Sequence, residues 1–245
     1  MFQAEDLVKQ AIERHGDRLA VACSFGKDSI VVLHMALKYE PKVKVIFCNT
    51  GVEFPETIRY KEKIAQEWDL NLIETKPIKT FWQCIDDYGV PQMRGKGNHR
   101  VPKCCIYCKE KPALEAYRSS GVNTILTGIT AAESRQRDFL IKRYDNMDDS
   151  VDNVRFCGQR YYIRTENIWK YHPIAYWGEA QVWHYIDNNA IPINPVYEKW
   201  GGIYDRVGCL PCTAYKDWEQ KLSKTHPKLY LRLKELADPK QMRLV

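Results

Sequence analysis

A six-residue segment between an apolar run and a helical pattern constrains the fold of this 245-residue chain most strongly. Residues 24–29 read SFGKDS; they follow the apolar run at 19–23 and precede a helix that we expect from Ser29 to about Tyr39. A turn from a buried strand into a helix directs backbone N–H groups and the positive end of the helix dipole at one point, where an anion binds favourably. The segment therefore predicts a phosphate-binding loop in an α/β fold.

Each residue type in this loop has a physical reason to be there. Gly26 lets the backbone approach a phosphate closely, and Lys27 supplies a positive charge. Ser24 and Ser29 offer hydroxyl donors, whereas Asp28 is suited to holding a metal ion or fixing the loop. The spacing differs from the GxxxxGK[ST] loop, so γ-phosphate transfer is not implied. An ordinary helix cap is the alternative interpretation.

The rest of the chain alternates short apolar runs with helical patterns, which predicts a parallel twisted sheet flanked by helices. Further strands are expected at 43–48, 71–75 and 123–126, and helices at 4–15, 55–68, 109–118, 179–188 and 218–236. Residues 77–103 are expected to form an irregular loop near an active site, and 138–170 a surface insertion with a hairpin. We divide the chain into a nucleotide-binding α/β domain, 1–170, and a small Cys-rich helical segment, 171–245, packed on the same domain.

Composition narrows the class of protein. The longest apolar stretch is too short to span a bilayer and the N-terminus has no secretory pattern, so we expect a cytoplasmic protein away from membranes. Nine cysteines in a reducing compartment indicate metal binding or catalysis more than disulfides. A net charge of +6 fits an anionic substrate such as a nucleotide and permits nucleic acid. The basic run at Arg94, Lys96, His99, Arg100 and Lys103 is expected to cover such a substrate or to be a solvated loop.

Four ordered blocks of the sequence resemble the phosphoadenosine phosphosulfate (PAPS) reductase family, within the PP-loop ATP pyrophosphatase superfamily. The first joins SFGKDS at 24–29 to CNTGVEFPET at 48–57. The second combines the cysteine pair at 104–105 with KEKPAL at 109–114, and the third is LTGI at 126–129 followed by Glu133-Ser134 and Arg137. The fourth runs from His172-Pro173-Ile174 to Tyr197. Such a family implies an adenine nucleotide alpha hydrolase-like fold.

The resemblance also implies where a nucleotide binds, namely across the carboxyl ends of the parallel strands. The loop at 24–29 would contact phosphates, and Lys27 and Asp28 would be catalytic. Nucleoside contacts are implied for Thr50, Gly51 and Gly128, and contacts to a phosphate or sulfate for Ser134 and Arg137. The implied nucleotide-binding set is Ser24, Gly26, Lys27, Asp28, Ser29, Thr50, Gly51, Gly128, Ser134 and Arg137.

Two departures from the family pattern bear on the reaction. The family's arginine after TG-Ile is Thr130 here, which weakens the expectation of a standard sulfate-bearing substrate. PAPS and adenosine phosphosulfate (APS) reductases also carry a nucleophilic cysteine in a C-terminal segment, and this sequence has no cysteine beyond Cys212. We therefore expect another chemistry than standard reduction.

The remaining cysteines form two clusters. The resemblance to APS reductases implies that Cys104, Cys105, Cys209 and Cys212 hold a 4Fe–4S cluster. A structural zinc and metal-free thiols are the alternatives, since four cysteines suit either metal. Cys108 is an extra thiol that could ligate, carry sulfur or react, and we assign it a catalytic role. Cys23, Cys48 and Cys157 are expected to be core residues, and Cys84 is left open.

Together these features predict an ATP-dependent sulfur-transfer enzyme that binds ATP with Mg²⁺ and releases pyrophosphate. The resemblance extends to proteins of bacterial DNA phosphorothioation (Dnd and Ssp types), which implies DNA as acceptor and a cysteine desulfurase or thiol donor as partner. A PAPS or APS reductase that forms sulfite is the first alternative. A non-catalytic nucleotide-binding subunit is the second. An oligomer is compatible with the sequence, which does not decide the oligomeric state.

Overall fold

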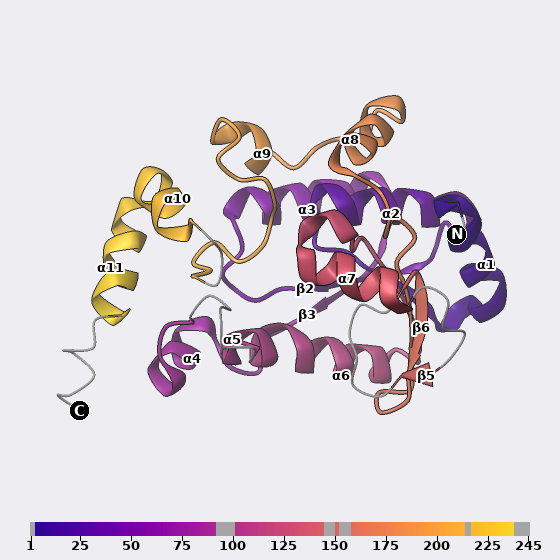
Figure 1. The fold of residues 1–245 in the computed structure, drawn as a ribbon, viewed down its shortest axis with the longest axis horizontal. Helices are drawn as coiled ribbons and strands as arrows, with labels where there is room; N and C mark the ends of the chain where they lie inside the picture. The colour runs from indigo at the N-terminus through magenta and orange to yellow at the C-terminus, as the bar shows by residue number, and fades with distance from the viewer. Residues whose placement is uncertain (1–2, 92–100, 145–149, 152–157, 214–216, 238–245) are drawn as a thin grey trace.

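The protein forms a seven-stranded, mostly parallel sheet with helices on both faces (Figure 1). The computed structural model describes residues 3–91, 101–144, 150–151, 158–213 and 217–237. The strand order is β3-β2-β1-β4-β7-β6-β5. The strands are β1 (Leu19–Ala22), β2 (Lys44–Cys48), β3 (Asn71–Thr75), β4 (Thr124–Thr127), β5 (Ser150–Val151), β6 (Arg160–Ile163) and β7 (Ile168–Tyr171).

The register of the central strands creates the site. Strand β1 pairs in parallel with β2 on one side and β4 on the other, with Val21 opposite both Val45 and Leu126. Strand β7 continues the sheet in parallel beyond β4, and β6 runs antiparallel to β7. The chain order reverses between β1 and β4, and ligands of such sheets bind at that switch point, beyond the carboxyl ends of the strands.

Successive residues of the central strands pack into different cores, because side chains alternate across a sheet. Val21 and Val45 belong to the core beneath α1 (Ala4–His15), α2 (Lys27–Tyr39), α3 (Pro55–Glu67) and α8 (Glu179–Asn188). Ala20 and Ile46 pack instead with α6 (Lys111–Ser119). Figure 1 shows α2 and α3 along one face and α6 along the other. The expected parallel sheet flanked by helices is thus confirmed.

Three elements differ from the sequence prediction. The helix expected at 218–236 is two helices, α10 (Trp218–Thr225) and α11 (Pro227–Ala237), because Pro227 has no N–H and starts a new helix. Residues expected to be irregular contain α4 (Phe81–Tyr88), whose capping box pairs Thr80 with Gln83. The expected surface insertion does contain a β6–β7 hairpin, but β7 is a strand of the main sheet. The basic run from 94 to 100 and Cys157 lie outside the described residues.

The segment before α6 forms one continuous helical path of three pieces. Helix α5 (Lys103–Cys105) passes into a π-helical turn at Ile106–Glu110 and then into α6. A single π-turn inside a helix is common at functional sites. The remaining elements are two helices, α7 (Arg135–Tyr144) and α9 (Val196–Lys199), and 3₁₀ turns at Gly16–Arg18 and Ala131–Glu133.

The expected boundary between residues 170 and 171 falls inside β7, and it stays a prediction. Residues beyond it contribute to the principal core, where Val182 and Ile186 of α8 are buried with α2. Within the described part of the chain, no helix combines the length and apolarity that crossing a membrane requires.

Candidate nucleotide and thiol site

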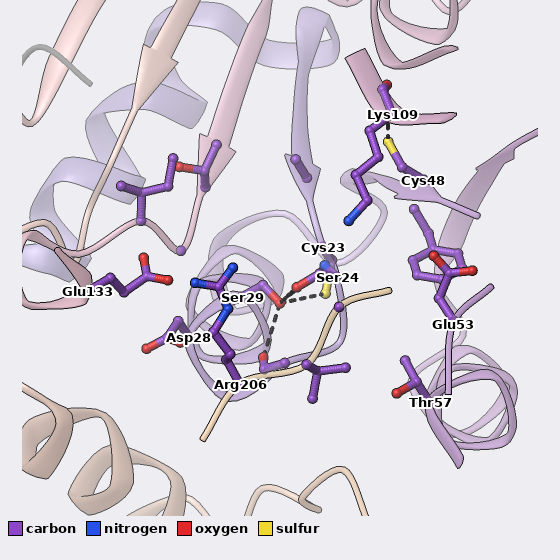
Figure 2. A pocket seen from close by; sticks show the side chains of 18 of the residues that line it. Cys23, Ser24, Asp28, Ser29, Cys48, Glu53, Thr57, Lys109, Glu133 and Arg206 are labelled. Carbon is purple, nitrogen blue, oxygen red and sulfur yellow. Dashed lines mark hydrogen bonds between the residues drawn. The ribbon is translucent and has the colours of Figure 1, made fainter. Parts of the chain in front are cut away.

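A cavity of about 300 Å³ opens beyond the carboxyl ends of β1, β2 and β4. Its walls come from the loop after β1, the segment after β4, the π-turn and the segment at 206–208. Figure 2 shows Asp28, Glu133 and Arg206 gathered on one side of this cavity and Cys48, Glu53 and Lys109 on the other. The loop predicted from the sequence therefore lies at the topological switch point.

The backbone of this loop is held in an uncommon conformation at Phe25. Phe25 has a φ of 57° although it is not glycine, and such a left-handed residue costs about 1–2 kcal/mol. Its fully buried ring packs edge-to-face on Phe47 and Tyr60, with centroids 5.5 and 6.3 Å away. Asn194 Nδ2 also donates to the Phe25 carbonyl at 3.1 Å. Core packing thus stabilises the turn, and the signal in the sequence was an aromatic residue inside a polar loop.

Serine hydroxyls close the loop from within. Ser29 Oγ donates to the Gly26 carbonyl at 3.0 Å and accepts from the Ser24 N–H at 3.2 Å. The two hydroxyl oxygens of Ser24 and Ser29 are 3.2 Å apart, and both residues line the cavity. Cys23 and Cys48, expected as core residues, also line it. Burial raises the pKa of the Cys23 thiol to about 11, so this thiol is neutral near pH 7.

Lys27 lines a second cavity that adjoins the larger one. Its side chain is 9% exposed, and its Nζ is 3.2 Å from Asp28 Oδ2, 3.3 Å from the Asp205 carbonyl and 3.8 Å from Glu179 Oε1. This second cavity, of about 210 Å³, is also lined by Thr130. The predicted phosphate-binding lysine therefore faces a compartment that adjoins the larger cavity.

Three side chains form the wall between the two compartments. Asp28, Glu133 and Arg206 line both cavities. Glu133 forms an ion pair with Arg137, which lines the larger cavity, and accepts the Thr130 N–H at 3.4 Å. The position that carries arginine in the family pattern is thus a buried threonine beside a carboxylate.

Gly128 is required by a close approach of two backbones. A Cβ at this position would stand 2.5 Å from the Asp28 carbonyl carbon and 2.6 Å from the Ser29 nitrogen. The segment after β4 can therefore rest on the first turn of α2 only with glycine here. Ser134, predicted to face phosphate, accepts the Arg137 N–H at 3.2 Å through its Oγ, at the start of α7, and its phosphate contact stays a prediction.

The segment after β2 connects the cavity to the cysteines. Thr50 is buried, and its N–H and hydroxyl both donate to the Glu53 carboxylate. The Thr50 hydroxyl is also 3.4 Å from Cys209 Sγ, whereas Gly51 is exposed with a φ of 76°. Glu53 lines the cavity and was not predicted as a site residue. Sequence reasoning could have found it as a carboxylate within the quoted block at 48–57.

Three of the predicted metal-ligating thiols, those of Cys105, Cys209 and Cys212, lie near the fourth, Cys104. A hydrogen bond to Cys105, burial and the nearby thiols of Cys105, Cys209 and Cys212 raise the pKa of Cys104. Residues 53 and 209 form a β-bridge, which fixes the Cys209–Cys212 loop beside β2. Nevertheless, among the described residues no group of three or more histidine, cysteine or acidic side chains is arranged to hold a metal ion.

Cys108 lies in the π-turn, near Cys84, Cys105 and Cys209. It is 2% exposed, donates to the Lys79 carbonyl at 3.2 Å, and lies beside Cys84 of α4. Burial and the neighbouring thiols raise the pKa of Cys108 to about 12. Its catalytic role stays a prediction, and in these surroundings its thiol is protonated near pH 7.

Comparison with known proteins agrees with the geometry. The profile described as phosphoadenosine phosphosulfate reductase domain matches residues 18–215. An adenosine 5'-phosphosulfate reductase of Lysinibacillus sphaericus is 29% identical over 226 residues, which cover 86% of this chain and 83% of the relative.

Two solved structures share the fold. A phosphoadenylyl-sulfate reductase from Candida auris, in a phosphate complex, aligns at 22% identity with a TM-score of 0.59, over 85% of this chain and 88% of its own. A U34-tRNA thiolase from Methanococcus maripaludis with its 4Fe-4S cluster aligns at 12% identity with a TM-score of 0.55, over 99% and 80%. With the loop at the switch point and the family profile over most of its length, the chain belongs to the phosphoadenosine phosphosulfate reductase domain family.

Proposed function

We propose that this protein is an ATP-dependent sulfur-transfer enzyme that cleaves ATP to AMP and pyrophosphate. The observation that carries the proposal is the pair of adjoining cavities that share Asp28, Glu133 and Arg206. Cleavage between the α- and β-phosphates requires the adenylate and the pyrophosphate to separate while both are held. Two compartments that share a wall of charged side chains support that requirement.

The carboxylates of the site fit a magnesium–nucleotide complex. Mg²⁺ is usually held by one or two carboxylates together with substrate phosphates. Asp28, Glu53 and Glu133 all line the larger cavity, so such a pair is available even though no group of three metal-ligating side chains is formed among the described residues. When bound, Mg²⁺ would supply neutralisation of phosphate charge.

The cationic side chains would act on the charges that develop during the reaction. Lys109 lines the larger cavity, Arg206 lines both, and the Lys27 ammonium lies in the smaller one. Cations held in place stabilise phosphate charge without reorganising during the reaction. Lys27 would retain the departing pyrophosphate, while Arg206 would contact the phosphates at the point of cleavage.

The chemistry of the transfer balances in two steps. A phosphate oxygen of the acceptor attacks the α-phosphorus of ATP, the bond to the β-phosphate oxygen breaks, and pyrophosphate leaves. Sulfur at the oxidation level of sulfide then attacks the acceptor phosphorus, and AMP leaves with the former acceptor oxygen. We propose the DNA backbone as acceptor and a cysteine desulfurase or another thiol donor as the source of sulfur. The outer sulfur of a donor persulfide reaches the oxidation level of sulfide by taking two electrons from a pair of thiols, which become a disulfide.

The four predicted ligand thiols fit an iron–sulfur cofactor by their chemistry. Thiolates are the ligands of 4Fe–4S clusters, although four cysteines suit zinc as well. Cys104, Cys105, Cys209 and Cys212 would hold the group, and it would supply a site for binding or delivering sulfur. The Thr50 hydroxyl lies between Cys209 and Glu53, so this region adjoins the nucleotide cavity.

Anaerobic equilibrium binding tests the proposal. Trp177 lines the smaller cavity beside Lys27, so tryptophan fluorescence should report nucleotide binding there. We expect tight ATP binding that requires Mg²⁺, weak PAPS and APS binding, and pyrophosphate release when acceptor and sulfur donor are present. Asp28→Asn should abolish the Mg²⁺ dependence. Sulfur incorporation that continues without ATP would contradict the proposal.

A sulfonucleotide reductase is the second candidate. The sequence similarity supports this candidate, because the Lysinibacillus protein with 29% identity is named an adenosine 5'-phosphosulfate reductase. In that case the cavity would bind APS or PAPS. A thiol would attack the sulfur and displace the adenosine phosphate, and a second thiol would then release sulfite from the S-sulfonate and form a disulfide. Anaerobic assays with thiol donors decide: sulfite formation together with preferential APS or PAPS binding would establish the reductase.

A further inference from the structure

A group of exposed and half-buried lysines and tyrosines lies on and beside α4, α5, the π-turn and α6. Lys103, Tyr107 and Lys111 follow one another at four-residue intervals along the path from α5 through the π-turn to α6. Residues four apart in a helix share a face. Lys79, just before α4, and Tyr88, at the end of α4, complete the group, which we call the Lys–Tyr face. Figure 1 shows α4, α5 and α6 in a row along the lower edge of the molecule.

The two tyrosines form an aromatic platform. The rings of Tyr88 and Tyr107 are parallel within 4°, with centroids 5.9 Å apart, and Tyr88 Oη donates to Tyr107 Oη at 3.3 Å. Tyr88 is 44% exposed and Tyr107 is half-buried, so part of this aromatic surface faces solvent. Aromatic rings that do not pack in a core are available for stacking by a flat partner.

Three ammonium groups surround this platform. Lys79 Nζ is 5.3 Å from both ring centroids, Lys103 Nζ is 5.7 Å from that of Tyr88, and Lys111 Nζ is 4.9 Å from that of Tyr107. Lys79 pairs with Asp87 at 37% side-chain exposure. Within the described ranges, Lys103 and Lys111 are exposed and form no ion pair with a carboxylate. The face therefore offers positive charge next to stacking surfaces.

We propose that the Lys–Tyr face binds single-stranded nucleic acid, with bases stacked on Tyr88 and Tyr107 and phosphates at Lys79, Lys103 and Lys111. Stacking of a base on an aromatic side chain contributes about 1–3 kcal/mol, and it needs an unpaired base. Lysine side chains neutralise the phosphates of the nucleic-acid backbone and do not distinguish base sequence. An acidic protein would use the lysines but would have no need of two parallel tyrosine rings.

The place of this face gives the bound strand a role, which rests on the proposed sulfur transfer. The same helical path carries Cys104 and Cys105 of the thiol group, and Lys109, which lines the nucleotide cavity. A strand on the outer side thus lies one helix diameter, about 10 Å, from the proposed chemistry. The Lys–Tyr face would hold the acceptor strand while its backbone reaches the cavity.

Fluorescence anisotropy with a labelled, mixed-sequence single-stranded DNA oligonucleotide tests the inference without ATP. The double variant Lys103→Gln/Lys111→Gln should bind at least about tenfold more weakly, and its log–log salt dependence should be shallower by about 1.4, since each lost phosphate contact removes about 0.7. The matched control Lys9→Gln/Lys63→Gln removes the same charge from exposed positions on α1 and α3, and it should bind like the wild type.

Stacking is tested separately from charge. Tyr88→Phe keeps an aromatic ring and should retain binding, whereas Tyr88→Leu should lose about fivefold or more, with circular dichroism confirming that both variants fold. Four results would each overturn the inference. The lysine control could lose as much affinity as Lys103→Gln/Lys111→Gln, or the two Tyr88 variants could lose affinity equally. Duplex DNA could bind as tightly as the single strand, or polyglutamate could compete as effectively as the single strand.

The same preparations distinguish this inference from the proposed function. Pyrophosphate release without oligonucleotide binding would overturn the inference and leave the ATP chemistry in place. Oligonucleotide binding through the Lys–Tyr face without ATP cleavage would support the inference and overturn the proposed reaction.

Discussion

The hydroxyl of Tyr197 accepts the backbone N–H of Lys27 at 2.9 Å, and this joins α9 to the first residue of the helix behind the phosphate loop. The same hydroxyl lies 3.2 Å from the point where a Cβ of Gly26 would stand. Burial raises the pKa of Tyr197, so its hydroxyl stays neutral. A tyrosine from the far end of the family domain therefore sets the position of the loop.

We expect Tyr197→Phe to loosen this loop. The buried N–H of Lys27 loses its acceptor, which costs about 1–3 kcal/mol in the free energy of unfolding. Nucleotide affinity should fall severalfold with it, because the loop is no longer held in one position. Urea unfolding and tryptophan fluorescence titration measure the two effects.

Tyr162→Phe is the control for that change. Its hydroxyl donates to Asn167 Oδ1 at 2.6 Å in an exposed part of the β6–β7 hairpin. This variant should change stability by less than about 0.5 kcal/mol and leave nucleotide binding intact. Equal behaviour of the two variants would contradict the assigned role of Tyr197.

Gly128→Ala should damage both stability and binding. The added methyl group would meet backbone atoms of Asp28 and Ser29 at 2.5–2.6 Å, and backbone cannot move aside as a flexible side chain does. We expect a loss of about 1–3 kcal/mol in unfolding free energy and a displaced first turn of α2. Gly178→Ala, whose methyl group would meet nothing closer than 3.9 Å, should be much milder. Denaturation midpoints of both variants measure the two losses of stability.

Replacement of cysteines by serine tests the metal prediction one thiol at a time. Cys104→Ser, Cys105→Ser, Cys209→Ser and Cys212→Ser should each lower the anaerobic iron and sulfide content, since serine is a poor ligand for these clusters. Cys84→Ser is the control, because Cys84 is buried on α4 beside Cys108. Zinc in place of iron in the wild type would select the alternative cofactor.

Cys108→Ser separates ligation from catalysis. Cys108 donates to the Lys79 carbonyl, a contact that serine can keep, so we expect iron content to be retained. If Cys108 carries sulfur, transfer should stop while ATP binding persists. Loss of iron in this variant would instead make Cys108 a ligand.

His172 should make the protein less stable in mild acid. Burial, with repulsion from Lys170 and Arg137, lowers the pKa of His172 to about 3, and Nδ1 lies 2.6 Å from the Thr127 hydroxyl. The unfolded chain binds this proton below about pH 6.5 and the folded chain below about pH 3, so stability is lost as pH falls through that interval. The loss approaches about 1.4 kcal/mol per pH unit.

The variant His172→Asn should flatten this dependence. Between about pH 7 and about pH 5, its unfolding free energy should fall by about 2 kcal/mol less than that of the wild type. His184→Asn, at an exposed position on α8, should follow the wild-type slope. Urea unfolding at both pH values measures the slopes; equal slopes for wild type and His172→Asn would contradict the assignment.

Local patterns predicted the fold well. The apolar run at 19–23, the loop and the helix after it are adjacent in sequence, and the structure places β1 and α2 there. The capping box at Thr80 and Gln83 was an equally local signal for α4 and was missed. The break at Pro227 followed from the missing N–H of proline and could have been predicted too.

By itself, the sequence determined the sheet, the place of the phosphate loop and the family, because strand–turn–helix patterns and ordered motifs are properties of neighbouring residues. The tertiary structure alone decided which compartment Lys27 faces, since its partners Tyr197 and Asp205 lie 170 and 178 residues away. It also placed Glu53 in the cavity and brought Cys108 beside Cys84. Side-chain direction depends on packing between distant segments, which no local pattern encodes.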